Sequence, residues 1–160
     1  MVFLYNSSIF LLRVGIWVAA FFNDKARMFY NGRRGLMPKI EKDFQSNTDP
    51  VIWIHCASLG EFEQGRPVIE RLKEELPQIR ILLTFFSPSG YEVRKNYSEA
   101  DFIYYLPLDT ASKARQFVAL TKPSLAVFVK YEFWYHFTSQ LRKQKIPLVS
   151  ISAIFRPEQI

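Results

Sequence analysis

Apolar runs and amphipathic stretches alternate along most of the chain. From residue 51 onward, short runs rich in β-branched and aromatic residues predict strands at 51–56, 79–84, 102–106, 124–130 and 146–152. The stretches between them carry apolar residues at helical spacing and predict helices near 61–75, 88–97, 110–120 and 132–144. Strands that alternate with helices in this way form βαβ units with right-handed crossovers. We therefore predict an α/β fold with a Rossmann-like, doubly wound parallel sheet.

Residues 1–22 form a separate apolar segment before the alternating region. A membrane-spanning helix needs about 20 mostly apolar residues, but polar side chains interrupt this segment at Asn6, Ser7, Ser8 and Arg13. Asn6 and Arg13 are seven residues apart and share one helix face, while apolar side chains cover much of the rest. We expect a membrane-associated anchor helix that lies in the interface. A spanning anchor and a buried soluble helix are the alternatives.

Basic residues gather directly after this apolar segment. The chain has a net charge of +6, and between residues 25 and 42 only Glu41 opposes the six cations Lys25, Arg27, Arg33, Arg34, Lys39 and Lys42. This arrangement is typical of a basic segment beside a membrane, on its cytoplasmic side. A solvated helix face is the alternative. Because the cations do not interleave with aromatic side chains, we expect no nucleic-acid partner.

These patterns divide the chain into an anchor at 1–22, a basic connector at 23–50 and a Rossmann-like domain at 51–160. Cys56 is the only cysteine, and His55 and His136 are the only histidines, so we predict neither a disulfide framework nor a metal site. A reducing, cytoplasmic setting fits this composition. The sequence has no G-x-G-x-x-G and no Walker motif, which disfavours dinucleotide and P-loop chemistry.

The strand at 51–56 ends at Ser58-Leu59-Gly60-Glu61, where a helical pattern begins. Ligands of open α/β sheets collect at the carboxyl ends of the strands, so Glu61 is a candidate general base. Alternatively, Ser58 or Glu61 caps the helix and Gly60 permits a tight turn. A second carboxylate, Glu132, follows the fourth strand. If the strands are ordered 3-2-1-4-5, the two carboxylates flank one crevice; otherwise Glu132 pairs with Lys130 and caps its own helix.

A third candidate segment, Thr84 to Gly90, follows the second strand. Ser87 and Pro88 are typical of an N-cap followed by proline at the first helical position. The N-terminus of a helix with nearby hydroxyl groups can also bind an anion. The segment therefore predicts either a simple helix cap or part of a binding site.

Together, these segments resemble the Kdo (3-deoxy-D-manno-octulosonic acid) transferases of lipopolysaccharide assembly. The strongest likeness lies in Trp53 to Glu61 and in Tyr131-Glu132-Phe133-Trp134, and the loop from Thr84 to Gly90 matches between them. The apolar anchor and the basic connector also match in order. The resemblance implies a GT-B glycosyltransferase, in which an N-terminal Rossmann-like domain holds the acceptor and a second domain binds the donor. This chain resembles the first domain only, and we expect the donor domain to be absent from it.

The resemblance implies a role for each acidic residue. Glu61 would be the general base that removes the proton from an acceptor hydroxyl, and Glu132 would stabilise the transition state of an inverting displacement. We assign acceptor binding to residues of the three segments: Ser58, Gly60, Thr84, Ser87, Gly90 and Lys130. The implied partners are a lipid A precursor as acceptor, CMP-Kdo as donor substrate through the missing domain, and the cytoplasmic surface of the bacterial inner membrane. No cofactor is implied. Another lipid-directed GT-B glycosyltransferase and a non-catalytic acceptor-binding module are the alternatives.

Overall fold

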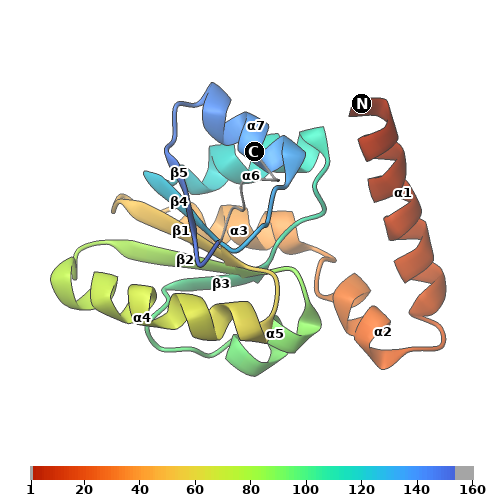
Figure 1. The fold of residues 1–160 in the computed structure, drawn as a ribbon, viewed down its shortest axis with the longest axis horizontal. Helices are drawn as coiled ribbons and strands as arrows, with labels where there is room; N and C mark the ends of the chain where they lie inside the picture. The colour runs from red at the N-terminus through yellow and green to blue at the C-terminus, as the bar shows by residue number, and fades with distance from the viewer. Residues whose placement is uncertain (1, 154–160) are drawn as a thin grey trace.

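The protein is a parallel β-sheet covered by helices on both faces, with a long helix standing to one side (Figure 1). The computed structural model describes residues 2–153. Its strands are β1 (Val51–Cys56), β2 (Arg80–Phe85), β3 (Phe102–Tyr105), β4 (Leu125–Val129) and β5 (Leu148–Ile151). They form one all-parallel sheet in the order β3-β2-β1-β4-β5. The predicted fold class and strand order are confirmed.

The helices are α1 (Val2–Ala19), α2 (Asp24–Asn31), α3 (Leu36–Phe44), α4 (Leu59–Glu75), α5 (Pro88–Arg94), α6 (Ala111–Thr121) and α7 (Tyr135–Lys143). Helices α4 and α5 cover one face of the sheet, and α3, α6 and α7 cover the other (Figure 1). Four of these helices correspond to the predicted ones, with ends that differ by at most three residues. Because β1 lies at the centre of the sheet, all six of its residues are buried.

Alternate residues of the central strand enter two separate cores. Trp53 packs with Phe117 and Phe137 in the core under α3, α6 and α7. Ile54 and its neighbours of the same parity face the other core, under α4. The sheet is therefore buried on both faces, which is why its strands appear in the sequence as nearly continuous apolar runs.

The segment predicted as a connector contains two short helices, and the second of them belongs to the main core. Helix α3 begins after Gly35, whose left-handed φ of 66° suits glycine. Its buried side chains, Leu36, Met37, Ile40 and Phe44, pack against the sheet. Residues 36–44 therefore help to close the core of the domain that was expected to begin at residue 51.

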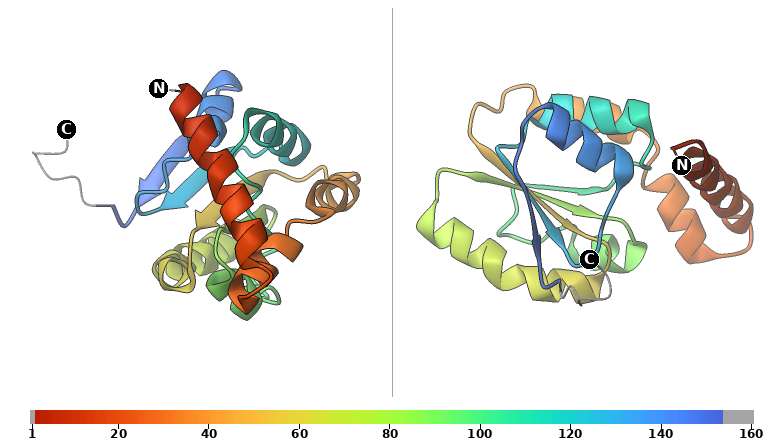
Figure 2. Two further views of the ribbon diagram at one scale, coloured as in Figure 1. Left: turned by 90° about the vertical axis from the view of Figure 1, so that its right-hand side faces the viewer. Right: turned by 45° about the horizontal axis from the view of Figure 1, so that its top comes forward.

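Helix α1 contacts the domain along one narrow face, with its first turns near α7 and its last turn leading into α2 (Figure 2). Ile9 is its one buried residue. The Tyr5 hydroxyl donates to Asp109 Oδ2 at 2.5 Å, and Asn6 Oδ1 lies 2.7 Å from His136 Nε2. Tyr5 and Asn6 thus connect the first turns of α1 to Asp109 and His136 of the domain. The buried Asp109 carboxylate also accepts the N–H groups of His136 and Phe137, so it caps α7 while it holds α1.

The rest of α1 is strongly apolar and open to solvent. Its 18 residues have a mean hydropathy of 1.6, and the helix is long and apolar enough to cross a membrane. Phe3 is 80% exposed and Phe10 62% exposed. An exposed apolar surface of this size marks an interaction site.

Candidate functional site

The two predicted acidic residues follow neighbouring strands, β1 and β4, which pair in the sheet. Glu61 is in the first turn of α4, and Glu132 is in the segment between β4 and α7. Both carboxylates lie close enough to Cys56, the last residue of β1, to affect its titration. Burial is the main cause that raises the pKa of the Cys56 thiol, and the charges of Glu61 and Glu132 raise it further. Both side chains therefore lie at the carboxyl ends of two paired strands.

Glu61 is held by a single backbone contact. The Ala57 N–H donates to Glu61 Oε2, so the side chain folds back over the N-terminus of α4. Ser58 occupies the N-cap position, but its hydroxyl makes no capping hydrogen bond. Among residues 2–153, Glu61 Oε1 has no hydrogen-bond partner. One carboxylate oxygen is thus fixed by the backbone, and the other is without a hydrogen-bond partner in the described part of the chain.

Glu132 is held instead by aromatic and imidazole groups. Its side chain is 19% exposed, and its Oε2 accepts the Trp134 indole N–H at 2.8 Å and lies 3.5 Å from His55 Nε2. Trp134 Nε1 is also 3.2 Å from His55 Nε2. The alternative prediction, a Glu132–Lys130 ion pair, is not among the ion pairs of the described residues.

His55 anchors this group from inside the sheet, and its role was missed in the sequence. It is fully buried, and its Nδ1 lies 3.1 Å from the Thr84 carbonyl and 2.9 Å from the Thr84 hydroxyl. Thr84 Oγ1 in turn accepts the Trp53 indole N–H at 2.8 Å. His55 thus joins Thr84 on its Nδ1 side to Trp134 and Glu132 on its Nε2 side. In the sequence, the sign of this role was that His55 is a polar residue in an otherwise apolar strand.

Two of the predicted acceptor-binding residues, Thr84 and Gly90, have structural roles. Thr84 is completely buried, and its hydroxyl is occupied by Trp53 and His55. Gly90 is buried as well, and a Cβ there would stand 2.3 Å from the Phe85 ring, so glycine allows α5 to pack on β2. Both residues are buried, and their predicted contact with an acceptor stays untested.

The other four predicted residues lie at the carboxyl edge of the sheet. Ser58 and Gly60 begin α4, and a Cβ on Gly60 would meet nothing within 4 Å. Ser87 caps α5 through Ser89 N at 3.2 Å, which leaves its predicted contact with an acceptor untested. Lys130 has a left-handed φ of 65°, an unusual backbone for a residue with a side chain. Its N–H donates to Ile151 O, so β5 fixes the turn that leads to Glu132.

An aromatic wall extends from this group toward α2. The Phe86 ring lies 4.7 Å from the Trp134 ring and 5.0 Å from the Phe29 ring, between centroids. Arg33 braces the wall. Its guanidinium lies 3.5 Å from the Phe29 ring centroid and donates to the carbonyls of Phe29, Phe86 and Leu106. Arg33 was grouped with the other cations of the basic segment. In the structure its guanidinium is half-buried against three carbonyl groups and an aromatic ring.

The protein is an open, parallel α/β domain with two acidic side chains at the carboxyl ends of neighbouring strands. Proteins of this fold class bind their ligands at that edge of the sheet. The family follows from sequence comparison. Residues 30–160 match the family model of 3-deoxy-D-manno-octulosonic-acid transferase (kdotransferase). The chain belongs to this family, and the predicted resemblance is confirmed.

Individual relatives agree with this assignment. The 3-deoxy-D-manno-octulosonic acid transferase of Aquifex aeolicus is 36% identical over 113 residues, which cover 70% of this chain and 30% of the relative. The enzyme of the same name from Haemophilus influenzae is 34% identical over 64% of this chain and 24% of the relative. The one from Chlamydia trachomatis is 29% identical over 79% and 32%. The matched part of the chain thus spans about a quarter to a third of these relatives.

Proposed function

We propose that this chain forms the acceptor-binding part of an enzyme that transfers Kdo from CMP-Kdo to a lipid A precursor at the cytoplasmic face of the bacterial inner membrane. The observation that carries the proposal is the position of Glu61 and Glu132 at adjacent strand ends in a member of the Kdo transferase family. The exposed apolar face of α1 supports a membrane-bound acceptor. Ser58, Gly60, Ser87 and Lys130 are proposed to contact that acceptor.

In the proposed reaction, Glu61 is the general base. Its unoccupied Oε1 removes the proton from an acceptor hydroxyl while the Ala57 N–H holds Oε2 in place. The hydroxyl oxygen attacks the anomeric carbon of Kdo from the face opposite the leaving group. The bond from that carbon to the phosphate oxygen of CMP breaks, CMP leaves with the electron pair, and the configuration inverts.

Glu132 is proposed to act on charge rather than on a proton. A sugar carbon between two partners in a displacement develops positive charge, and a fixed carboxylate near it lowers the barrier. Because Trp134 and His55 hold Glu132, the carboxylate does not need to reorganise during the reaction. CMP-Kdo is the proposed donor substrate.

The decisive test compares glutamine variants in the full-length enzyme. Glu61→Gln keeps the size of the side chain but removes the base, so we expect kcat to fall by about 10²–10⁴-fold with little change in the KM for the acceptor. The matched control is Glu75→Gln, at the far end of α4, which should leave both constants unchanged. A Glu61→Gln enzyme that retains more than about a tenth of the activity would contradict the base role.

A binding experiment separates the proposal from its alternatives. The chain is titrated with lipid A precursor in the presence and absence of CMP-Kdo, and product formation is followed in parallel. Binding without turnover, in a protein that holds both domains, would favour an acceptor-binding module. Turnover with a different nucleotide sugar but not with CMP-Kdo would favour another lipid-directed glycosyltransferase.

A further inference from the structure

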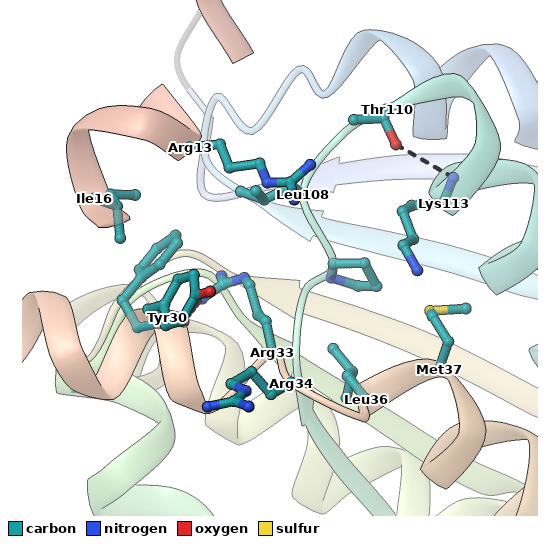
Figure 3. A pocket seen from close by; sticks show the side chains of 12 residues that line it. Arg13, Ile16, Tyr30, Arg33, Arg34, Leu36, Met37, Leu108, Thr110 and Lys113 are labelled. Atoms are coloured by element: carbon teal, nitrogen blue, oxygen red, sulfur yellow. Dashed lines mark hydrogen bonds between the residues drawn. The ribbon is translucent and has the colours of Figure 1, made fainter. Parts of the chain in front are cut away.

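A pocket of about 290 Å³ lies between α1, the segment from α2 to α3, and the first turn of α6 (Figure 3). One of its lining residues is Arg33, which donates a hydrogen bond to the Phe86 carbonyl. The Phe86 ring in turn packs against Trp134. The pocket is therefore next to the acidic site but does not contain Glu61 or Glu132. It has no part in the reaction proposed above.

The pocket is lined by positive charge from three parts of the chain. Arg13 comes from α1, Arg33 and Arg34 from the turn before α3, and Lys113 from α6 (Figure 3). The lining contains no Asp or Glu, and none of the four cations is in an ion pair within residues 2–153. Arg33 donates only to carbonyls, and burial lowers the pKa of its guanidinium. A cluster of cations without counter-charges favours an anion.

The first turn of α6 adds to this preference. Thr110 is the N-cap of the helix, and it lines the pocket together with Lys113. The positive end of the α6 dipole therefore points toward the same space as the four cations. A phosphate group is the chemistry that combines best with several cations and a helix N-terminus.

The remaining lining is apolar and continues into the membrane-facing helix. Ile16, Phe29, Leu36, Met37 and Leu108 form the greater part of the wall. Outside the pocket, α1 exposes Trp17 and Phe21, which are 49% and 66% accessible. An arginine in the middle of an apolar helix is costly unless it faces a polar partner or cavity. Arg13 meets this condition by facing the pocket.

We propose that this pocket binds the phosphodiester headgroup of an anionic membrane phospholipid, such as phosphatidylglycerol, with its acyl chains leaving along Ile16 and α1. The phosphate contacts Arg13, Arg34 and Lys113, and the lipid fills the space between α1 and the domain. The apolar wall and the adjoining apolar helix favour a lipid over free phosphate. The inference rests on the proposed contact of α1 with a membrane, but not on the proposed catalytic roles of Glu61 and Glu132.

The test uses the full-length protein and dihexanoyl lipids below their micelle concentration, so that binding does not require a bilayer. Calorimetric titration compares dihexanoyl-phosphatidylglycerol, dihexanoyl-phosphatidylcholine and inorganic phosphate. The pocket variant is Arg13→Gln with Lys113→Gln. Its matched control is Lys25→Gln with Lys42→Gln, which removes two exposed cations outside this pocket. Arg34→Gln is a second, single variant at the exposed rim, and thermal unfolding verifies that each protein is folded.

We expect phosphatidylglycerol to bind at least about tenfold more tightly than the other two ligands, because it offers both the charge and the apolar chains. The pocket variant should weaken that binding by at least about tenfold, Arg34→Gln by a smaller factor, and the control by less than about twofold. Equal losses in the pocket and control variants would overturn the proposal in favour of general charge attraction. Equal affinity for phosphatidylcholine would exclude a headgroup site, and equal affinity for inorganic phosphate would identify an anion site without a lipid. Loss of transfer activity in Glu61→Gln bears on none of these outcomes.

Discussion

The two carboxylates of the candidate site are held in opposite ways. Glu61 stands in an open corner, residues 57–61, where one backbone N–H fixes it, the Ser58 hydroxyl makes no capping bond and Gly60 has open space beside it. Glu132 stands in a packed corner, formed by His55, Thr84, Glu132 and Trp134, where side chains of three strand ends surround it. A carboxylate that must receive a proton from a substrate benefits from an accessible oxygen. One that acts through its charge benefits from being rigid.

The strongest expected effect concerns the packed corner. His55→Leu removes the group that joins Thr84 to Trp134 and Glu132, so it should lower the free energy of unfolding by about 2–3 kcal/mol. Urea denaturation measures the change. The control Ser58→Thr, in the open corner, should change stability little. A His55→Leu protein as stable as the parent would show that the packed corner is not held by this network.

The second comparison uses two glycines, Gly60 in the open corner at the start of α4 and Gly90 where α5 packs on β2. Gly90→Ala places a methyl group against the Phe85 ring, and we expect a loss of about 1–2 kcal/mol. Gly60→Ala meets nothing within 4 Å and has a helical backbone, so it should be neutral or stabilising by up to about 1 kcal/mol. Thermal unfolding of the two variants checks the difference, and equal effects would contradict the distinction between an open and a packed side.

A smaller change tests the indole N–H alone. Trp134→Phe keeps an aromatic ring against Phe86 but removes the donor to Glu132, so stability should fall by about 1 kcal/mol. Because Glu132 then loses its fixed position, transfer activity should fall several-fold while the KM for the acceptor changes little. A lower stability with unchanged kcat would mean that Trp134 supports the fold but does not position Glu132.

The smallest expected effect compares two helix caps. Ser87→Ala removes a hydroxyl that caps α5, and it should cost about 1 kcal/mol. Ser58→Ala removes a hydroxyl that makes no capping bond, so the cost should be below about 0.5 kcal/mol. Denaturation curves of both variants measure these two changes in the free energy of unfolding. A larger loss for Ser58→Ala would place an unrecognised contact in the open corner.

Much of the sheet could be predicted because its strands are buried on both faces and therefore appear as apolar runs. The position of Glu61 and Glu132 then followed from the strand order. The surroundings of Glu132 could not be predicted in the same way. His55 and Thr84 are 29 residues apart and meet only because β1 and β2 pair in register. A pattern of apolar and polar positions contains no information about which side chain a buried polar group will reach.

The basic segment shows a second limit. The six cations within residues 25–42 suggested one common role beside a membrane. Arg33 nevertheless packs inside the domain, because three carbonyl groups and an aromatic ring enclose its guanidinium. The same segment was expected to be helical or irregular, but its residues alone did not show that α3 packs into the core of the domain. Burial depends on the partner surface, and the partner is far away in the chain.

Asp109 links helix α1 to helix α7. The same carboxylate holds Tyr5 of α1 and the first N–H groups of α7, the helix that follows Glu132. Displacing α1 from the domain would break the Tyr5 hydrogen bond to the same carboxylate that caps α7, so the two helices share one buried anchor. A substitution at Asp109 would therefore affect the position of α1 and the start of the helix after Glu132 together.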